Sequence, residues 1–313
     1  MYQHILSTMT PLVVFLSIAM IFTSAQSDSK SPICNKWHAM LPNTPMPEII
    51  KDLIKTDGNG HMSASKFPNH FDVRASLKNY YEWYYHCVQD AKNLFLKKDM
   101  YPGAETKKVR LARTITGTSF LPREEADRIP FSFAKFDQIL DHLAIVPGST
   151  AAKHVENTLR DCENPDFKGE RKFCATSLES MIEFVTSELG NDVRVTTTGH
   201  AKDEQQEATY KIAAEGKEMP GDKLVVCHPM PYPYTIYYCH VNKATKAYVT
   251  PLIGKDGSMV NTGTVCHFDT SAWNAFFFEM LNVKPGTKPI CHFVPQDHLL
   301  WTPGPSSDQH VAS

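Results

Sequence analysis

The amino-acid sequence predicts an α+β fold whose C-terminal domain is rich in β-strands, contains disulfides and carries a few helices. Two segments before residue 190 have helical periodicity. From Val193 onward, β-branched and aromatic residues form short runs that Gly, Pro and Asn separate. A chain of 313 residues can bury a full core without disulfides, so its eight cysteines indicate a further role.

Composition excludes several broad classes of protein. The chain has 32 Lys+Arg and 34 Asp+Glu, and its hydrophobic fraction of 42% is neither that of a disordered chain nor collagen-like. A formal charge of −2 gives no basic excess for nucleic acid or an anionic membrane. The sequence has no Gly-rich phosphate loop and no nucleophile elbow, so phosphoryl transfer and hydrolysis find no support.

Residues 1–25 have the pattern of a secretory signal peptide. Pro11 to Phe22 is an apolar run of 12 residues, too short to span a bilayer, and small residues follow it. A buried strand or a membrane anchor is the alternative. Cleavage would give a soluble mature chain that begins near Gln26. That chain would lie in an oxidising compartment, where cysteines form disulfides.

The segments up to residue 190 are predicted in turn. Residues 26–70 are rich in Pro, Ser, Asn and Gly, which predicts a loosely packed N-terminal region. From Leu77 to Phe95, apolar and aromatic residues recur close to helical spacing. Residues 150–161 favour a helix. A second helix is predicted from Thr176 to Leu189, with Thr176 and Glu179 as its capping box.

The rest of the chain favours strands. The strand-like segments are 193–199, 223–228, 235–241, 247–253, 258–268 and 289–294. One helix is predicted among them, from Thr270 to Leu281. Together these segments predict an α+β domain of roughly 200 residues behind the N-terminal region.

Four Cys-His dipeptides are the most specific feature of the sequence. Gaps of 10, 25 and 23 residues separate Cys227-His228, Cys239-His240, Cys266-His267 and Cys291-His292. Each dipeptide lies in a strand-like run, where adjacent residues point to opposite faces. If these runs share one sheet, the cysteines can form two disulfides on one face. The histidines can then gather around one or two metal ions on the other.

This donor set favours copper. Zinc-finger spacing is missing, and an oxidising compartment removes free thiolates. Imidazoles without thiolate suit copper, with zinc or nickel as alternatives, and an open copper site supports one-electron oxidation with O2. The competing interpretation is that the cysteines are purely structural and the histidines are ordinary polar neighbours. Isolated histidines such as His142, His154 and His298 are expected to be surface or core residues rather than ligands.

The spacing of the four dipeptides resembles that of the plant BURP-domain proteins. Other matching motifs are 120–123, 129–132, Cys162 with Gly169-Glu170, 174–181, 283–287 and Trp301. The resemblance covers about residues 95–302, which leaves 26–94 as a variable N-terminal region and 303–313 as a C-terminal tail. The Pro-rich segment 41–47 resembles the seed-protein branch of the family.

The resemblance implies a secreted plant protein of the cell wall, apoplast or storage vacuole. Some family members are copper-dependent peptide cyclases, in which the motif histidines bind copper. Those histidines correspond here to His228, His240, His267 and His292. Other members are stress- or seed-associated proteins without assigned chemistry.

Cysteine pairing is expected from the same resemblance. It implies that Cys162 pairs with Cys174. The cysteines of the dipeptides, Cys227, Cys239, Cys266 and Cys291, are also expected in disulfides, with their connectivity open. Cys34 and Cys87 either pair with each other or leave one thiol free.

A peptide substrate is expected either within this chain or as a separate precursor. Cyclases of this family that are fused to their substrate carry the core peptide in the N-terminal region, where Tyr81, Trp83 and Tyr85 are candidate cross-linked aromatics. No Gln precedes them and the segment is not repeated, while its helical spacing also fits a packing face. Two hypotheses follow: a copper-dependent oxidative peptide cyclase, or a non-enzymatic structural protein whose partners are cell-wall components.

Overall fold

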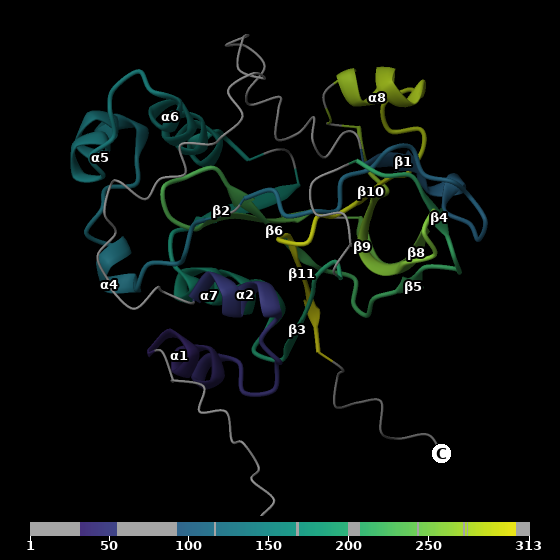
Figure 1. Ribbon diagram of the computed structural model, residues 1–313, viewed down its shortest axis with the longest axis horizontal. Helices are drawn as coiled ribbons and strands as arrows, with labels where there is room; N and C mark the ends of the chain where they lie inside the picture. The colour runs from purple at the N-terminus through teal and green to yellow at the C-terminus, as the bar shows by residue number, and fades with distance from the viewer. Residues whose placement is uncertain are drawn as a thin grey trace, which may run out of the picture. The chain divides into compact units, whose positions relative to one another are not determined.

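The computed structural model of the protein is shown in Figure 1. It describes residues 32–54, 93–115, 117–166, 169–199, 207–242, 244–271, 273 and 275–304. Two antiparallel sheets with flanking helices make up these residues, which confirms the α+β, β-rich prediction. No helix in these ranges is long and apolar enough to cross a membrane. The predicted signal peptide and the aromatics Tyr81, Trp83 and Tyr85 lie outside the described residues.

The helices are mostly short. They are α1 (Pro32–Met40), α2 (Glu48–Ile54), α4 (Arg123–Ala126), α5 (Phe136–His142), α6 (Thr150–Glu163), α7 (Leu178–Leu189) and α8 (Ala275–Leu281), with 3-10 turns η3 (Lys97–Asp99) and η4 (Phe133–Lys135). The α6 helix confirms the helix predicted at 150–161, and its N-cap Ser149 accepts a hydrogen bond from the amide of Ala152. The helix predicted from Thr270 begins only at Ala275.

The strands form two separate sheets. The first, here called the β8–β9 sheet, has the order β1 (Leu94–Leu96), β10 (Ile290–Phe293), β9 (Met259–His267), β8 (Thr245–Gly254), β4 (Tyr210–Ile212), with β5 (Lys217–Glu218) also paired to β8. The second, the β6–β7 sheet, has the order β2 (Glu170–Ala175), β7 (Ile236–Asn242), β6 (Val225–Met230), β11 (Leu299–Pro303), β3 (Val193–Thr196). Segments far apart in sequence therefore become neighbours in each sheet.

Helix α7 covers one face of the β6–β7 sheet, and it contacts β2, β6, β7 and β11 (Figure 1). Its capping box is formed by Ser177 and Ser180, so the predicted pair of Thr176 and Glu179 was wrong by one residue. Strand β2 runs to Ala175, so the helix starts later than the hydrophobic pattern indicates. Glu179 instead accepts a hydrogen bond from Lys36 of α1, at 2.8 Å.

The N-terminal region is packed where it is described, in contrast to the loose packing predicted for residues 26–70. Trp37 of α1 is fully buried, and its ring lies 5.8 Å from that of Trp301. Its indole N–H donates to the carbonyl of Thr44, whose hydroxyl donates to the carbonyl of Val193. Pro and Ser content alone misled the prediction, because it ignores what a single buried tryptophan contributes to a core.

The helix predicted from Leu77 to Phe95 does not extend to its end. Residues Leu94–Leu96 form strand β1, which pairs with β10 so that Leu94 lies opposite His292. The open edge of β10 offers backbone partners over this stretch, and tertiary pairing overrides the local spacing. The part of that prediction before residue 93 lies outside the described residues.

Candidate metal centre

The four Cys-His dipeptides are divided between the two sheets. Cys227 on β6 lies opposite Cys239 on β7, and Cys266 on β9 lies opposite Cys291 on β10. Each pair forms a disulfide across its two strands, with a Cα–Cα distance of 4.0 Å. The four dipeptides therefore do not share one sheet, as the metal hypothesis had assumed. Strands β6 and β7 pair within one sheet, and strands β9 and β10 pair within the other.

A third disulfide joins Cys162 at the end of α6 to Cys174 on β2. It is the pairing that the family resemblance implies. The side chains of Cys34 and Cys87 lie outside what the structure describes.

The cysteines of the dipeptides point into apolar cores. Cys227 and Cys239 belong to the cluster that includes Trp301 beneath α7. Cys266 and Cys291 belong to a separate cluster with Phe293. Because adjacent strand residues point to opposite faces, the neighbouring histidines lie on the other face of each sheet.

Those two histidine-bearing faces pack against each other. Val226 lies opposite His240 in the register of the β6–β7 sheet, and Val265 lies opposite His292 in the β8–β9 sheet. Each valine therefore shares a face with the histidine opposite it. Val226 and Val265 belong to one buried cluster, completed by Leu224, Ala247, Val294 and Leu300. The four histidines accordingly project into the space between the sheets.

The first histidine pair consists of His228 and His240. Their Nε2 atoms face each other at 3.1 Å. The other ring nitrogen of His240, Nδ1, lies 2.8 Å from Oε1 of Glu170, whose side chain is only 6% exposed. The Nδ1 atom of His228 lies 3.0 Å from Nδ1 of His298. Each ring thus directs one nitrogen at its pair mate and the other at an outer partner.

The second pair consists of His267 and His292. Their rings are stacked, with centroids 5.6 Å apart and an angle of 6° between the planes. Thr245 Oγ1 lies 3.2 Å from Nδ1 of His267. The ring of Trp273 contacts the ring of His267 edge-on, with the two ring centroids 4.9 Å apart. The Nδ1 atom of His292 is buried and has no hydrogen-bond partner. A buried ring nitrogen left in this way is costly unless a ligand takes it.

Burial keeps the second pair neutral. It lowers the pKa of His267 well below 6.5, and the nearby His292 and His240 lower it further. Burial and His240 likewise lower the pKa of His292 to about 4. At neutral pH both imidazoles therefore keep a lone pair available for a metal ion. The influence of His240 on both rings also indicates that the two pairs are close enough to interact.

The histidines meet in pairs rather than in a finished metal cage. Across the part of the chain that the structure describes, no group of three or more His, Cys, Asp or Glu side chains is arranged to hold a metal ion as it stands. The donor chemistry is nevertheless distinctive. The neighbouring cysteines are in disulfides, so imidazole is the only donor that the dipeptides offer.

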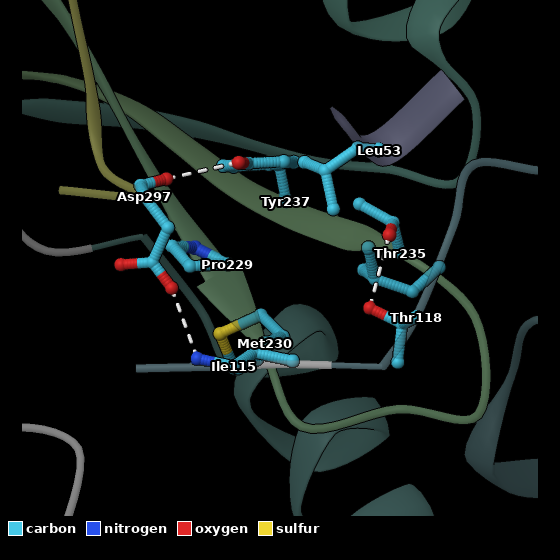
Figure 2. A pocket seen from close by; sticks show the side chains of 9 residues that line it. Leu53, Ile115, Thr118, Pro229, Met230, Thr235, Tyr237 and Asp297 are labelled. Carbon is cyan, nitrogen blue, oxygen red and sulfur yellow. Dashed lines mark hydrogen bonds between the residues drawn. The ribbon is translucent and has the colours of Figure 1, made fainter. Parts of the chain in front are cut away.

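A small cavity lies where β6 ends and β7 begins, lined by Pro229, Met230 and Tyr237 (Figure 2). Its volume is about 10 Å³, room for about one water molecule. Asp297 lines it and is held firmly: its carboxylate accepts hydrogen bonds from the amides of Thr114 and Ile115, and its backbone carbonyl accepts one from the hydroxyl of Tyr237. Burial raises the pKa of this carboxyl group above its ordinary value. The cavity is too small for a peptide.

Two members of the site were missed by sequence reasoning. His298 was expected to be a surface or core residue, and at 4% exposure it is a core residue, but its contact with His228 was not predicted. Glu170 was noted only as part of a family motif. Its contact with His240 depends on the pairing of β2 with β7, across 70 positions of sequence, which no local pattern reports.

A two-sheet α+β domain with cross-strand disulfides and two buried histidine pairs is the class that the fold and site define. A profile of the BURP domain matches residues 93–303, and the chain belongs to the BURP-domain family. It is 39% identical over 278 residues to BURP domain-containing protein 5 of Oryza sativa subsp. japonica, an alignment that covers 85% of each chain.

Two further relatives share a shorter alignment. The chain is 44% identical over 243 residues to BURP domain-containing protein 3 of Oryza sativa subsp. japonica, covering 75% of this chain and 56% of that protein. It is 42% identical over 222 residues to BURP domain protein RD22 of Arabidopsis thaliana, covering 69% and 57% respectively. The alignment therefore spans little more than half the length of these two relatives.

Proposed function

We propose that this chain binds copper through the histidines of its Cys-His dipeptides and uses it to cross-link a peptide side chain by oxidation. The ligands would be His228, His240, His267 and His292. The observation that carries the proposal is that the two histidine-bearing faces pack against each other, each held by its own disulfide.

The donor set suits copper. All four candidate ligands are imidazoles, and the adjacent sulfurs are in disulfides, which removes the thiolate donors typical of structural zinc. His292 has a buried Nδ1 without a partner, and the lowered pKa values of His267 and His292 keep both rings neutral. Glu170 contacts the far nitrogen of His240, as outer carboxylates commonly do for metal-binding histidines.

The protein's contribution is to position and protect. Bound copper would supply one-electron oxidation of a Tyr or Trp side chain, with O2 as the final electron acceptor. The histidines would hold the ion, the disulfides would fix the strands that carry them, and the packed sheets would exclude water. Each new bond between an aromatic side chain and a second peptide atom removes two hydrogens, which O2 accepts.

The peptide is proposed to lie either in this chain or in a separate precursor. Leu53, near the end of α2, lines the same cavity as Asp297, and Leu94 of β1 lies opposite His292. Segment 55–92 is therefore followed closely by a residue that lies opposite one of the candidate ligands. This supports Tyr81, Trp83 and Tyr85 as aromatics that react in cis, with a precursor acting in trans as the alternative.

We also propose that the chain is secreted. Three disulfides are compatible with an oxidising compartment. Removal of residues 1–25 as a signal peptide would direct the protein to the cell wall, apoplast or storage vacuole.

A non-enzymatic role in the wall or seed is the competing proposal. It is favoured by one observation: the histidines meet in pairs, and the described residues hold no preformed cage of three or more donors. In that case the disulfides would stabilise a binding or structural protein, with a metal serving only stability or with none.

A mass-spectrometric assay separates the two proposals. The oxidised protein would be incubated with Cu(II), air and peptides that include residues 75–90, and products would be searched for the loss of two hydrogens. His240→Ala should abolish the product, whereas His142→Ala, an exposed histidine at the end of α5, should not. An unchanged product profile in His240→Ala would overturn the proposed copper chemistry.

A further inference from the structure

We propose that Glu170 and His298 are positioning residues, which hold His240 and His228 with their Nε2 atoms directed at each other. Each engages the outer nitrogen of one ring, so the inner nitrogens, 3.1 Å apart, are left to face the space between them. The role in metal binding rests on the proposed function, while the orientation of the rings can be tested without metal.

Glu170 is placed by the register of β2 on β7. Glu170 lies opposite Asn242 and Lys172 lies opposite His240, so Glu170 shares the face of His240 one step along the sheet. Its Oε1 is 2.8 Å from Nδ1 of His240, and both side chains are largely buried, at 6% and 13% exposure. A carboxylate only accepts hydrogen bonds, so Nδ1 of His240 must carry the hydrogen. In the neutral ring the lone pair is then on Nε2, which faces His228.

His298 plays the matching part on the other side. It lies in the turn between β10 and β11, where its amide donates to the carbonyl of Pro295. Its ring stands nearly perpendicular to that of His228, at 82°, with the two Nδ1 atoms 3.0 Å apart. The preceding residue, Asp297, is held by the amides of Thr114 and Ile115, so this turn is fixed from outside the sheet.

The two outer contacts form one continuous line with the inner pair. From Glu170 it passes through His240, His228 and His298 to Asp297, whose Oδ1 lies 4.0 Å from Nε2 of His298. A carboxylate stands at each end, and both are buried. Outer partners of this kind fix the tautomer and orientation of metal-binding histidines, and their loss typically lowers metal affinity 10–100-fold.

A purely structural role for Glu170 makes a different prediction. A buried carboxylate can be needed for stability without setting which nitrogen of His240 carries the hydrogen. The tautomer of His240 is therefore the readout that distinguishes positioning from packing. Glu188 of α7 provides a matched control, because its carboxylate is buried, with 4% of the side chain exposed, and it pairs with Arg171 of β2 and with Lys223.

The first measurement is NMR of the metal-free protein with ¹⁵N-labelled histidine. In the wild type, His240 should carry its hydrogen on Nδ1. Glu170→Ala should shift it toward Nε2, while Glu170→Gln, which keeps an acceptor oxygen, should preserve much of the wild-type pattern. Glu188→Ala should leave it unchanged. A His240 tautomer that is the same in Glu170→Ala as in the wild type would overturn the proposal.

The second measurement is copper affinity by competition with a chelator. Glu170→Ala and His298→Ala should each weaken binding about 10–100-fold, and Glu188→Ala should match the wild type. His298→Gln, which keeps a polar side chain of similar reach, serves if His298→Ala does not fold. Affinities equal to wild type in both Glu170→Ala and the His298 variant would overturn the positioning role. A wild type that binds no copper would instead overturn the proposed function, and the tautomer measurement would still decide the role of Glu170.

Discussion

Replacing His292 by leucine should reduce the acid-induced loss of stability of the metal-free protein. His292 lies on β10 with 7% of its surface exposed, and its Nδ1 has no hydrogen-bond partner. Burial, and then the charge of His240, lowers the pKa of His292 from 6.5 to about 4. Leucine fills a similar space and cannot take up a proton.

The sign follows from proton binding by the two states. The imidazole of the unfolded chain takes up a proton near pH 6.5, whereas that of the folded chain does so only near pH 4. Between these values the unfolded chain binds more protons, so the free energy of unfolding falls as the pH falls. The stability that the neutral His292 ring allows is therefore fully present above pH 6.5, and it is lost progressively as the pH falls to 4. At about 1.36 kcal/mol for each pH unit, the loss is about 3 kcal/mol.

Other buried groups change stability in the same pH range, so the difference between two proteins is the quantity to measure. Burial raises the pKa values of Asp161 and Asp297, which makes stability fall as the pH rises. Urea unfolding of metal-free wild type and His292→Leu at pH 7 and pH 4 cancels these contributions. The wild type should lose about 3 kcal/mol more than the variant on acidification. Equal losses in the two proteins would refute the assignment of His292 as a buried neutral imidazole.

Three further predictions concern the framework. Asp161→Asn should stabilise the protein at pH 7 by about 4 kcal/mol, because burial raises the pKa of Asp161 from 3.8 to about 7 and each pH unit between these values corresponds to about 1.36 kcal/mol; an unchanged urea midpoint at pH 7 would contradict this. Cys266→Ala combined with Cys291→Ala should cost about 3.5 kcal/mol in urea unfolding, the loop-entropy value for a separation of 25 residues, and a loss below about 1 kcal/mol would count against it. Trp37→Ala should cost about 3–5 kcal/mol, since its side chain is fully buried and packs near Trp301. A melting temperature unchanged by that substitution would show that α1 is not part of the core.

The strands that carry the site could be predicted from local sequence, because their side chains alternate between two faces with a period of two residues. Val225, Cys227 and their neighbours alternate between two buried faces, so each Cys-His dipeptide separates a sulfur from an imidazole wherever it occurs. The division of the four dipeptides into two sheets could not be predicted in this way. It depends on which strands insert beside them, and β11, which pairs with both β6 and β3, was not predicted at all.

The same limit applies to the candidate site. The four motif histidines could be named from spacing, because the pattern recurs within one region of the chain. Their outer partners could not, since Glu170 reaches His240 only through the β2–β7 register and His298 reaches His228 only through a turn fixed by Thr114. Contacts of this kind are set by tertiary structure and leave no periodic trace in the sequence.

Titration of the oxidised protein with Cu(II), followed by electron paramagnetic resonance, tests the proposed metal centre most directly. The wild type should bind copper stoichiometrically with a signal split by imidazole nitrogens. His240→Ala should lose or alter that signal, while the exposed-histidine variant His142→Ala should retain it. A wild type that binds no copper, or a His240→Ala signal identical to that of the wild type, would contradict the proposal that the Cys-His histidines form a copper site.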